Sequence, residues 1–186
     1  MSEIEIIANK IKDTGGKLYL VGGAVRDELL GKEIHDEDYC VTGIKDFQKL
    51  FPEAYVRGKD FAVFDINGKE FAMARTETKQ GKGHKEFDIK TEPNITIEQD
   101  LSRRDITINS IAKDVLTQEI IDPYDGQKKK KNKIIRATSK SFSEDPLRVY
   151  RVARFAAQLG FSVEKETIKM MNELKGELEN LSKERV

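Results

Sequence analysis

The chain has 186 residues, 35% of them charged, and its 33 basic and 33 acidic side chains give a formal net charge of zero. This length suits one domain or one and a half, with a proper core. The mean hydropathy is −0.59, and without an 18-residue apolar run or a signal peptide we expect a soluble, cytoplasmic protein. The single cysteine, Cys40, excludes an internal disulfide and a cysteine-based zinc site. At zero net charge, nucleic-acid binding would need a local basic face.

The N-terminal part predicts a helix followed by a strand, a turn and a second helix. The first 14 residues carry apolar side chains at helical spacing. An apolar strand then meets Gly22-Gly23, ahead of a predicted helix Ala24–Leu30. Because glycine lacks a Cβ, such a turn brings backbone N–H groups close to a ligand at the positive end of a helix, where phosphates bind. Arg26, in the first helical turn, can reach the same anion.

Two carboxylates follow on the next predicted strand, at Asp36 and Asp38. Side chains two residues apart on a strand leave the same face, about 7 Å apart along the chain. They repel each other unless a cation lies between them, and Mg²⁺ binds through one or two carboxylates plus substrate phosphates. A lone D-x-D is most often a solvated strand end, but beside a phosphate-binding turn it predicts a nucleotide-metal site.

The middle of the chain predicts a hairpin and a loop. Apolar and polar residues alternate in two runs, Phe61–Ile66 and Glu70–Ala74. The runs are joined at Asn67-Gly68, and Asn-Gly between such runs is the strongest short hairpin signal. Taken alone, Glu70 is a surface residue beside the turn. The polar, glycine-bearing stretch Arg75–Asn94 shows no apolar periodicity and predicts a flexible loop.

The stretch Ile97–Asp114 has apolar residues at helical spacing and by itself predicts an amphipathic helix with a charged face. A helix does not explain the cluster Arg103-Arg104-Asp105, which is followed by Asn109. Arg104 and Asn109 can face a bound nucleotide, while Asp105 can orient an arginine.

The last third contains a lysine run and an arginine-bearing helix. The four lysines Lys128–Lys131 follow a turn. Such a run is either a solvated face or a contact with an RNA backbone. A helix start is predicted with Ser143 as N-cap and Pro146 in the first turn. In this helix three arginines recur every three residues and spread over about 120° of one face: Arg148, Arg151 and Arg154.

Four motifs occur in order: GG-x-V-R-D-x-L-L-G followed by D-x-D, A-R-T-E, R-R-D-x-T-I-N, and E-D-P-L-R-V-x-R-V-A-R-F. They resemble the class II tRNA nucleotidyltransferases and poly(A) polymerases of the superfamily that includes DNA polymerase β, most closely the bacterial CCA-adding enzymes. The resemblance covers roughly residues 17–186. It implies an α/β (α+β) fold with a polymerase-β-like head over residues 1–136, built as a mixed sheet flanked by helices. A helical neck over residues 137–186 would follow, truncated relative to family members that continue into body and tail domains.

The resemblance also implies roles for single residues. The implied catalytic acids are Asp36, Asp38 and Glu70, the first two as metal ligands. The implied nucleotide-binding residues are Gly22, Gly23, Arg26, Arg104, Asp105, Asn109, Asp145, Arg148, Arg151 and Arg154. Within that set, Asp145 and Arg148 would recognise the Watson–Crick edge of the incoming base. A carboxylate accepts from an exocyclic amine, and a guanidinium donates two parallel hydrogen bonds.

The implied activity is addition of CMP and AMP, from CTP and ATP, to the tRNA 3′ end with two Mg²⁺ ions. Alternatives within the family are an A-adding enzyme, a CC-adding enzyme and a poly(A) polymerase. A non-catalytic RNA- or nucleotide-binding module is the alternative from another class, and the presence of both carboxylates disfavours it. The sequence leaves open this specificity, the oligomeric state, and whether RNA binding needs missing C-terminal domains or a separate subunit.

Overall fold

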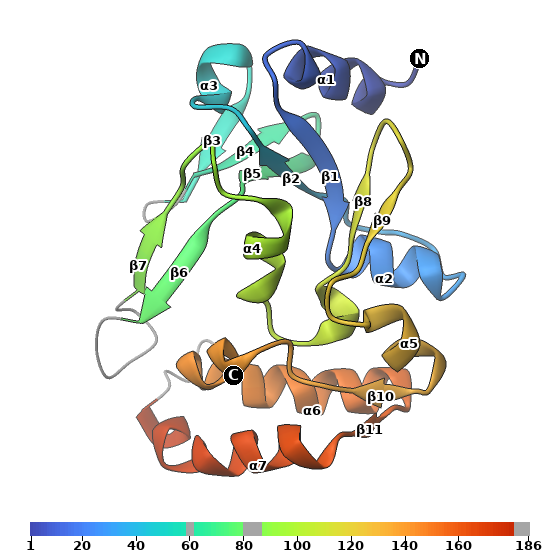
Figure 1. The fold of residues 1–186 in the computed structure, drawn as a ribbon, viewed down its shortest axis with the longest axis vertical. Coiled ribbons are helices and arrows are strands. Elements are labelled where there is room, and N and C mark those ends of the chain that lie inside the picture. The colour runs from blue at the N-terminus through green and yellow to red at the C-terminus, as the bar shows by residue number, and fades with distance from the viewer. Residues whose placement is uncertain (59–61, 80–86, 181–186) are drawn as a thin grey trace. The chain divides into compact units, whose positions relative to one another are not determined.

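A computed structural model describes residues 1–58, 62–79 and 87–180 (Figure 1). The chain divides into two compact units. Unit 1 consists of Met1–Thr76, Ile89–Leu101 and Ile111–Ile121, and unit 2 of Glu77–Asp88, Ser102–Ser110 and Asp122–Val186. The predicted domain division after residue 136 differs from these units and stays a prediction. Within the described ranges no helix is long and apolar enough to cross a membrane.

Unit 1 is built on a seven-stranded mixed sheet in the order β3-β4-β5-β2-β1-β8-β9. Its strands are β1 (Lys17–Val21), β2 (Asp38–Thr42), β3 (Tyr55–Arg57), β4 (Val63–Ile66), β5 (Lys69–Met73), β8 (Ala112–Asp114) and β9 (Ile120–Ile121). The strands β2 and β5 run parallel, and all other neighbours in this sheet are antiparallel. The expectation of a mixed sheet flanked by helices is confirmed.

The helices of unit 1 are α1 (Glu3–Lys12), α2 (Gly23–Leu29), α3 (Phe47–Leu50) and α4, which begins at Ile97 and ends at Ser102. Figure 1 shows α1 beside the start of β1. A capping box between Ser2 and Glu5 starts α1, and the helix buries Ile7 and Ile11. The helices predicted for the first 14 residues and after Gly22-Gly23 are therefore confirmed.

Strand register decides which side chains of the sheet face the main core of unit 1. Leu18 of β1 pairs with Val41 of β2, and both belong to the core that α1 and α3 cover. At its centre the ring of Phe47 lies 4.7 Å from the rings of Phe51 and Phe64. Because side chains alternate along a strand, the residues between these core positions point to the opposite face.

The predicted hairpin is confirmed, whereas the predicted loop is wrong in part. The strands β4 and β5 meet at Asn67-Gly68, both at positive φ, as a two-residue hairpin requires. Residues 76–79 and 87–90, predicted as loop, form the two-stranded sheet of β6 (Thr76–Lys79) and β7 (Phe87–Lys90). In β7 apolar and polar residues alternate over only four positions, too few to stand out in a polar stretch. Residues 80–86 lie outside the described part of the chain.

The helix predicted over residues 97–114 is wrong beyond Ser102. After α4 the chain turns, forms the short 3₁₀ helix η1 (Thr107–Asn109) and enters β8. The carboxylate of Asp105 accepts a hydrogen bond from the N–H of Ile106 at 2.8 Å, a local bond that competes with helical pairing. The apolar residues also serve different cores, since Ile106 packs in unit 2 whereas Ala112 lies in the sheet of unit 1.

Unit 2 is mostly helical. Its elements after residue 122 are α5 (Gly126–Lys131), β10 (Ile134–Ile135), η2 (Lys140–Glu144), α6 (Leu147–Leu159), β11 (Ser162–Val163), α7 (Lys165–Glu173) and η3 (Lys175–Asn180). Its core gathers buried side chains from η1, β10, η2 and α6, among them Ile108, Ile135, Phe142 and Val152.

The predicted N-cap at Ser143 is wrong, because Ser143 lies inside η2. The α-helix begins at Leu147, whose N–H donates to the carboxylate of Asp145 at 3.0 Å. The N-cap position is Pro146, three residues after the predicted Ser143, and the carboxylate that satisfies the Leu147 N–H comes from Asp145, one residue before that cap. Pro146 stands immediately before the first helical residue.

The core of unit 1 yields a first prediction. Phe47 is fully buried among three aromatic rings, so Phe47→Ala should lower the free energy of unfolding by about 3–5 kcal/mol. Tyr55→Ala, at a side chain that is 68% exposed, serves as the control and should change it by less than about 0.5 kcal/mol. Urea denaturation followed by circular dichroism measures both. Equal effects of the two substitutions would contradict the assignment of the core.

Candidate active site

The sheet of unit 1 brings two acids and the glycine turn together at the ends of three adjacent central strands. Asp38, the first residue of β2, is the in-register partner of Glu70 on the parallel strand β5. Neighbouring strands lie about 4.8 Å apart, and paired side chains leave the same face. On the other side of β2, Asp38 pairs with Val21, the residue before Gly22. The two carboxylates therefore share the sheet face opposite to the Phe47 core, next to the turn.

Asp36 does not lie on this strand, so the prediction that both aspartates belong to it is wrong for Asp36. The strand begins at Asp38, and Asp36 is an exposed residue two positions before it. The strand β2 begins no earlier than Asp38 because its neighbour β1 ends at the opposite position. β1 stops at Val21, and Gly22 turns away with φ 68° and ψ −128°, which leaves residues before Asp38 without a partner on that side.

The Gly22-Gly23 turn holds an arginine close to the backbone. Gly22 has a positive φ that favours glycine, and its N–H donates to the carbonyl of Ile111 at 3.4 Å. The guanidinium of Arg26 binds Asp27 through two hydrogen bonds of 2.8 Å. A Cβ on Gly23 would lie 3.6 Å from Nη2 of Arg26. The guanidinium of Arg26 is therefore fixed beside the turn in an ion pair with Asp27, which offsets its charge.

The residue between the two aspartates is anchored on the other face of the sheet. The carboxylate of Glu37 accepts hydrogen bonds from Nζ of Lys69 and, at 3.1 Å, from the hydroxyl of Tyr39. The Lys69 bond lowers the pKa of Glu37 below its ordinary value, while burial and the charge of Glu37 raise the pKa of Tyr39. Sequence reasoning missed this cluster, although strand alternation beside Asp38 is a signal that places Glu37 on the opposite face.

The acids fit a divalent metal ion by their chemistry. Hard cations such as Mg²⁺ prefer oxygen ligands and bind with one or two carboxylates plus substrate phosphates. Asp38 and Glu70 supply adjacent carboxylates, although Nη1 of Arg57 also lies 3.4 Å from Glu70. No group of three or more His, Cys, Asp or Glu side chains suited to a metal occurs in the described part of the chain. Substrate phosphates and water would supply the further ligands.

In unit 2 the buried carboxylate of Asp105 binds two of the other predicted residues. Its oxygens accept from Nδ2 of Asn109 at 3.2 Å and from Nε of Arg151 at 2.8 Å, besides the N–H of Ile106. The expectation that Asp105 orients an arginine is thus confirmed. Arg151 keeps 45% of its side chain exposed, so this carboxylate holds the guanidinium at the surface in one direction.

The arginines of α6 differ in their surroundings. Arg148 is 7% exposed, and its guanidinium donates to the carbonyls of Ser141, at 2.7 Å, and of Arg103. Burial lowers the pKa of Arg148, opposed mainly by the nearby charge of Asp145. Arg154 is exposed and lies over the ring of Phe155 at 5.5 Å. Base recognition by Asp145 and Arg148 stays a prediction.

Arg104 is half-buried and follows Arg103 in the chain. Arg103 forms an ion pair with Glu77 at 2.9 Å, with both side chains largely buried. Glu77 is the last residue of the A-R-T-E motif, and Arg103 is the first residue of R-R-D-x-T-I-N. The ion pair therefore connects the two motifs within unit 2. Sequence reasoning did not predict this pair, because 26 residues separate its members.

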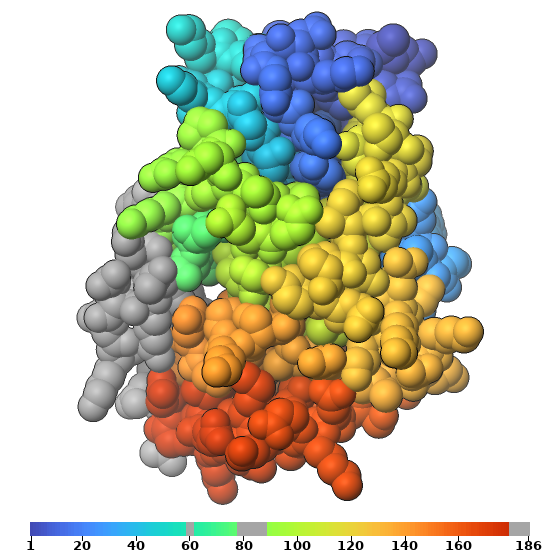
Figure 2. Space-filling view, in the orientation of Figure 1, coloured from blue at the N-terminus to red at the C-terminus, as the bar shows by residue number. Residues whose placement is uncertain are grey.

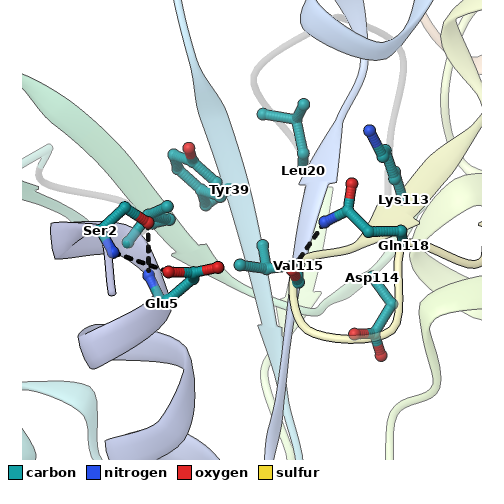
Figure 3. Close-up of a pocket in the computed structure, with 9 residues that line it drawn as sticks. Ser2, Glu5, Leu20, Tyr39, Lys113, Asp114, Val115 and Gln118 are labelled. Atoms are coloured by element: carbon teal, nitrogen blue, oxygen red, sulfur yellow. Dashed lines mark hydrogen bonds between the residues drawn. The ribbon is translucent and has the colours of Figure 1, made fainter.

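A pocket of about 170 Å³ lies in unit 1 between α1, β1 and the turn after β8 (Figure 3). None of the predicted site residues lines it. Its polar side chains are bound within the protein: Ser2 and Glu5 pair in the capping box, Gln118 donates to the carbonyl of Val115, and Lys113 pairs with Glu28. These groups are satisfied without a ligand, so the pocket is not the candidate active site.

Comparison with known proteins places the chain in a family. Residues 18–136 match the family described as "Poly A polymerase head domain". A Haemophilus influenzae protein named "Multifunctional CCA protein" is 51% identical over 179 residues, and one of that name from Vibrio parahaemolyticus is 49% identical over 177 residues. Each alignment covers 91% of this chain but only 42% and 43% of the relative. The chain thus spans less than half the length of these relatives.

Solved structures agree in fold. The Bacillus stearothermophilus CCA-adding enzyme in complex with CTP is 32% identical with a TM-score of 0.78, over 97% of this chain and 45% of that one. A tRNA nucleotidyltransferase complexed with a primer tRNA and an incoming ATP analogue is 34% identical with a TM-score of 0.76, over 96% and 53%. The fold expected from the motifs, a nucleotidyltransferase head followed by helices, is confirmed.

The Glu37 cluster yields a second prediction. Glu37→Gln should lower the free energy of unfolding at pH 7 by about 0.5–1 kcal/mol, a small effect because solvent screens a pair that is one-third exposed. The pKa of Glu37 is lowered in the folded state, so its stabilisation is present above about pH 4.5 and is lost as the pH falls through that lowered pKa. Urea denaturation at several pH values measures the difference between variant and parent.

The matched control for this substitution is Glu33→Gln, at an exposed glutamate in the same unit. It should leave stability unchanged at every pH. A double variant that also carries Lys69→Met should cost no more than Lys69→Met alone, since each change removes the same contact. Additive losses would contradict the coupling of Glu37 to Lys69.

Proposed function

Because the chain belongs to the poly(A) polymerase head-domain family, we propose that it is the head and neck part of a tRNA nucleotidyltransferase. Its substrates would be CTP, ATP and the 3′ end of tRNA, to which it would add CMP and AMP as a CCA-adding enzyme. The observation that carries this proposal is the in-register pair Asp38 and Glu70 beside the Gly22-Gly23 turn. A cytoplasmic location belongs to the same proposal.

In this reaction the 3′-oxygen of the RNA attacks the α-phosphorus of the nucleotide, and pyrophosphate leaves. Asp36 and Asp38 would hold Mg²⁺, which when bound would lower the pKa of the attacking hydroxyl and neutralise triphosphate charge, and Glu70 would complete the acidic cluster. The backbone of the Gly22-Gly23 turn and the guanidinium of Arg26 would bind the triphosphate. Their N–H groups, already held in place by the fold, would stabilise the anion without reorganisation.

The nucleotide-recognition residues are proposed from unit 2. Asp145 and Arg148 would bind the base edge, since cytosine and adenine share an exocyclic amine that a carboxylate can accept from. Support comes from the fixed positions of both side chains, Asp145 at the start of α6 and Arg148 against two backbone carbonyls. The remaining proposed nucleotide contacts or supports are Arg104, Asp105, Asn109, Arg151 and Arg154.

The first test removes the proposed metal ligands. Asp36→Ala combined with Asp38→Ala should abolish nucleotide transfer while leaving the folded structure intact, because both side chains are exposed. The control is Asp13→Ala combined with Glu53→Ala, two exposed acids of unit 1 that are not proposed ligands. Transfer is measured with radiolabelled nucleotides, and folding by circular dichroism. An active double variant would exclude the two-metal proposal.

The second test identifies the reaction. The protein and Mg²⁺ are incubated with tRNA that lacks CCA, tRNA that ends in CC, and complete tRNA, each with CTP, ATP or both. Stepwise growth to CCA supports the CCA-adding proposal. Growth by CC alone, by A alone or by long A-tails would instead select a CC-adding enzyme, an A-adding enzyme or a poly(A) polymerase. If neither extension nor nucleotide binding occurs, the catalytic proposal is wrong.

A further inference from the structure

The charge of the chain is divided unevenly between its two units. Unit 1 contains 13 basic and 19 acidic residues, and unit 2 contains 20 basic and 14 acidic residues. The formal net charges are therefore −6 and +6, which cancel in the whole chain. A polyanion would be repelled by the first and attracted by the second, so any extended contact with an RNA backbone is expected on unit 2.

The basic surplus of unit 2 includes a lysine-rich segment on and just after α5. Lys128 and Lys131 lie three residues apart on this helix, so they share a face, and both are exposed. Lys133, one residue past the helix cap, is exposed as well. Figure 2 shows this gold segment at the surface, with side chains that project outward at the right of the view. We call Lys128, Lys131 and Lys133 the lysine face.

Two neighbouring basic residues share an ion-pair partner within unit 2, which distinguishes them from the lysine face. Nζ of Lys129 lies 2.7 Å from Glu164, and Nε of Arg136 lies 3.4 Å from the other oxygen of that carboxylate. The side chain of Lys129 is only 17% exposed. One glutamate thus holds these two charges against the body of unit 2, and leaves the lysine face as the outward part of the segment.

The position of α5 connects this segment to the proposed nucleotide site. The helix packs against η1, the element that carries Asn109. Asn109 donates to Asp105, which in turn holds Arg151. We propose that the lysine face binds the phosphodiester backbone of the RNA whose 3′ end is extended, away from the reacting nucleotide. This inference rests on the proposed function.

The chemistry of the lysine face favours an RNA backbone over a protein or a membrane. Lysine ammonium groups bind phosphates as point charges, independent of sequence, and release counterions in doing so. A protein interface needs apolar or aromatic anchors, and a membrane-bound helix needs an apolar face to insert. Among the described residues, none of the exposed large hydrophobic side chains belongs to residues 126–133. A repeating anion is the partner that remains.

The test compares two triple variants of the 186-residue chain. Lys128→Gln, Lys131→Gln and Lys133→Gln together remove the lysine face. The matched control replaces Lys12, Lys45 and Lys49, three exposed lysines of unit 1, by glutamine, and changes the net charge equally. Binding of fluorescein-labelled tRNA that lacks CCA is measured by anisotropy from 50 to 300 mM salt. Transfer to a short single-stranded primer ending in CC is measured in parallel.

The lysine-face variant should bind tRNA about 10- to 100-fold more weakly at 100 mM salt, with a salt dependence shallower by about two to three units in the log–log slope. The control should bind as the parent does. Transfer to the short primer should be unchanged, because the inference assigns the lysine face to RNA away from the reacting nucleotide. If this transfer is absent in the parent, the proposed function fails, while the anisotropy still reports on the RNA contact.

Three results would overturn the inference. The first is a parent chain that does not bind tRNA at any of these salt concentrations. The second is equal weakening in the control variant, which would show a general effect of net charge. The third is equal loss of transfer on tRNA and on the short primer, which would assign the lysines to the nucleotide site rather than to the RNA backbone.

Discussion

The parallel pairing of β2 with β5 is the constraint on which the candidate active site depends. Its register joins Asp38 to Glu70 on one face, and the same alternation sends Glu37 and Lys69 to the other face, where they bind each other. A slip of one residue would turn the acids toward the Phe47 core and lose both arrangements at once. The apolar pattern of the two strands therefore fixes the position of the acids as firmly as it fixes the core. The acids need no contact with each other to be held in place.

Unit 2 positions its polar groups by a different means, a buried carboxylate. Asp105 accepts three hydrogen bonds, from Ile106, Asn109 and Arg151. A buried carboxylate without such partners would be strongly unfavourable, so these bonds are required for folding as well as for orientation. The bond from Ile106 lies between the end of α4 at Ser102 and the start of η1 at Thr107, where the chain has left the helical path. One side chain thus sets the local fold and holds the arginine that is proposed to line the nucleotide site.

The sequence predicts the parts of this protein whose signals are local. The hairpin at Asn67-Gly68 and the helix after Gly22-Gly23 follow from turn chemistry and apolar spacing, and both are confirmed. The prediction of one helix over residues 97–114 is wrong because the helical spacing of the apolar residues does not show that they belong to two different cores. The partners of Glu37 and Asp105 are 32 and 46 residues away, so sheet register and helix packing, which are tertiary properties, had to be known first. The motifs named the candidate residues, but only the fold shows which of them lie together.

The zero net charge of the chain is the sum of an acidic unit 1 and a basic unit 2. Three exposed acids of unit 1, Glu33, Asp36 and Asp38, lie within six residues, and exposed carboxylates at such spacing repel each other unless a cation is bound. An acidic unit is therefore suited to divalent ions and, through them, to the triphosphate. The basic unit needs no ion to attract an RNA backbone. Because the two requirements are opposite in sign, a protein that meets both on separate units can be neutral overall. The net charge of a whole chain is then a poor guide to nucleic-acid binding, and the charge of each compact unit is the quantity to examine.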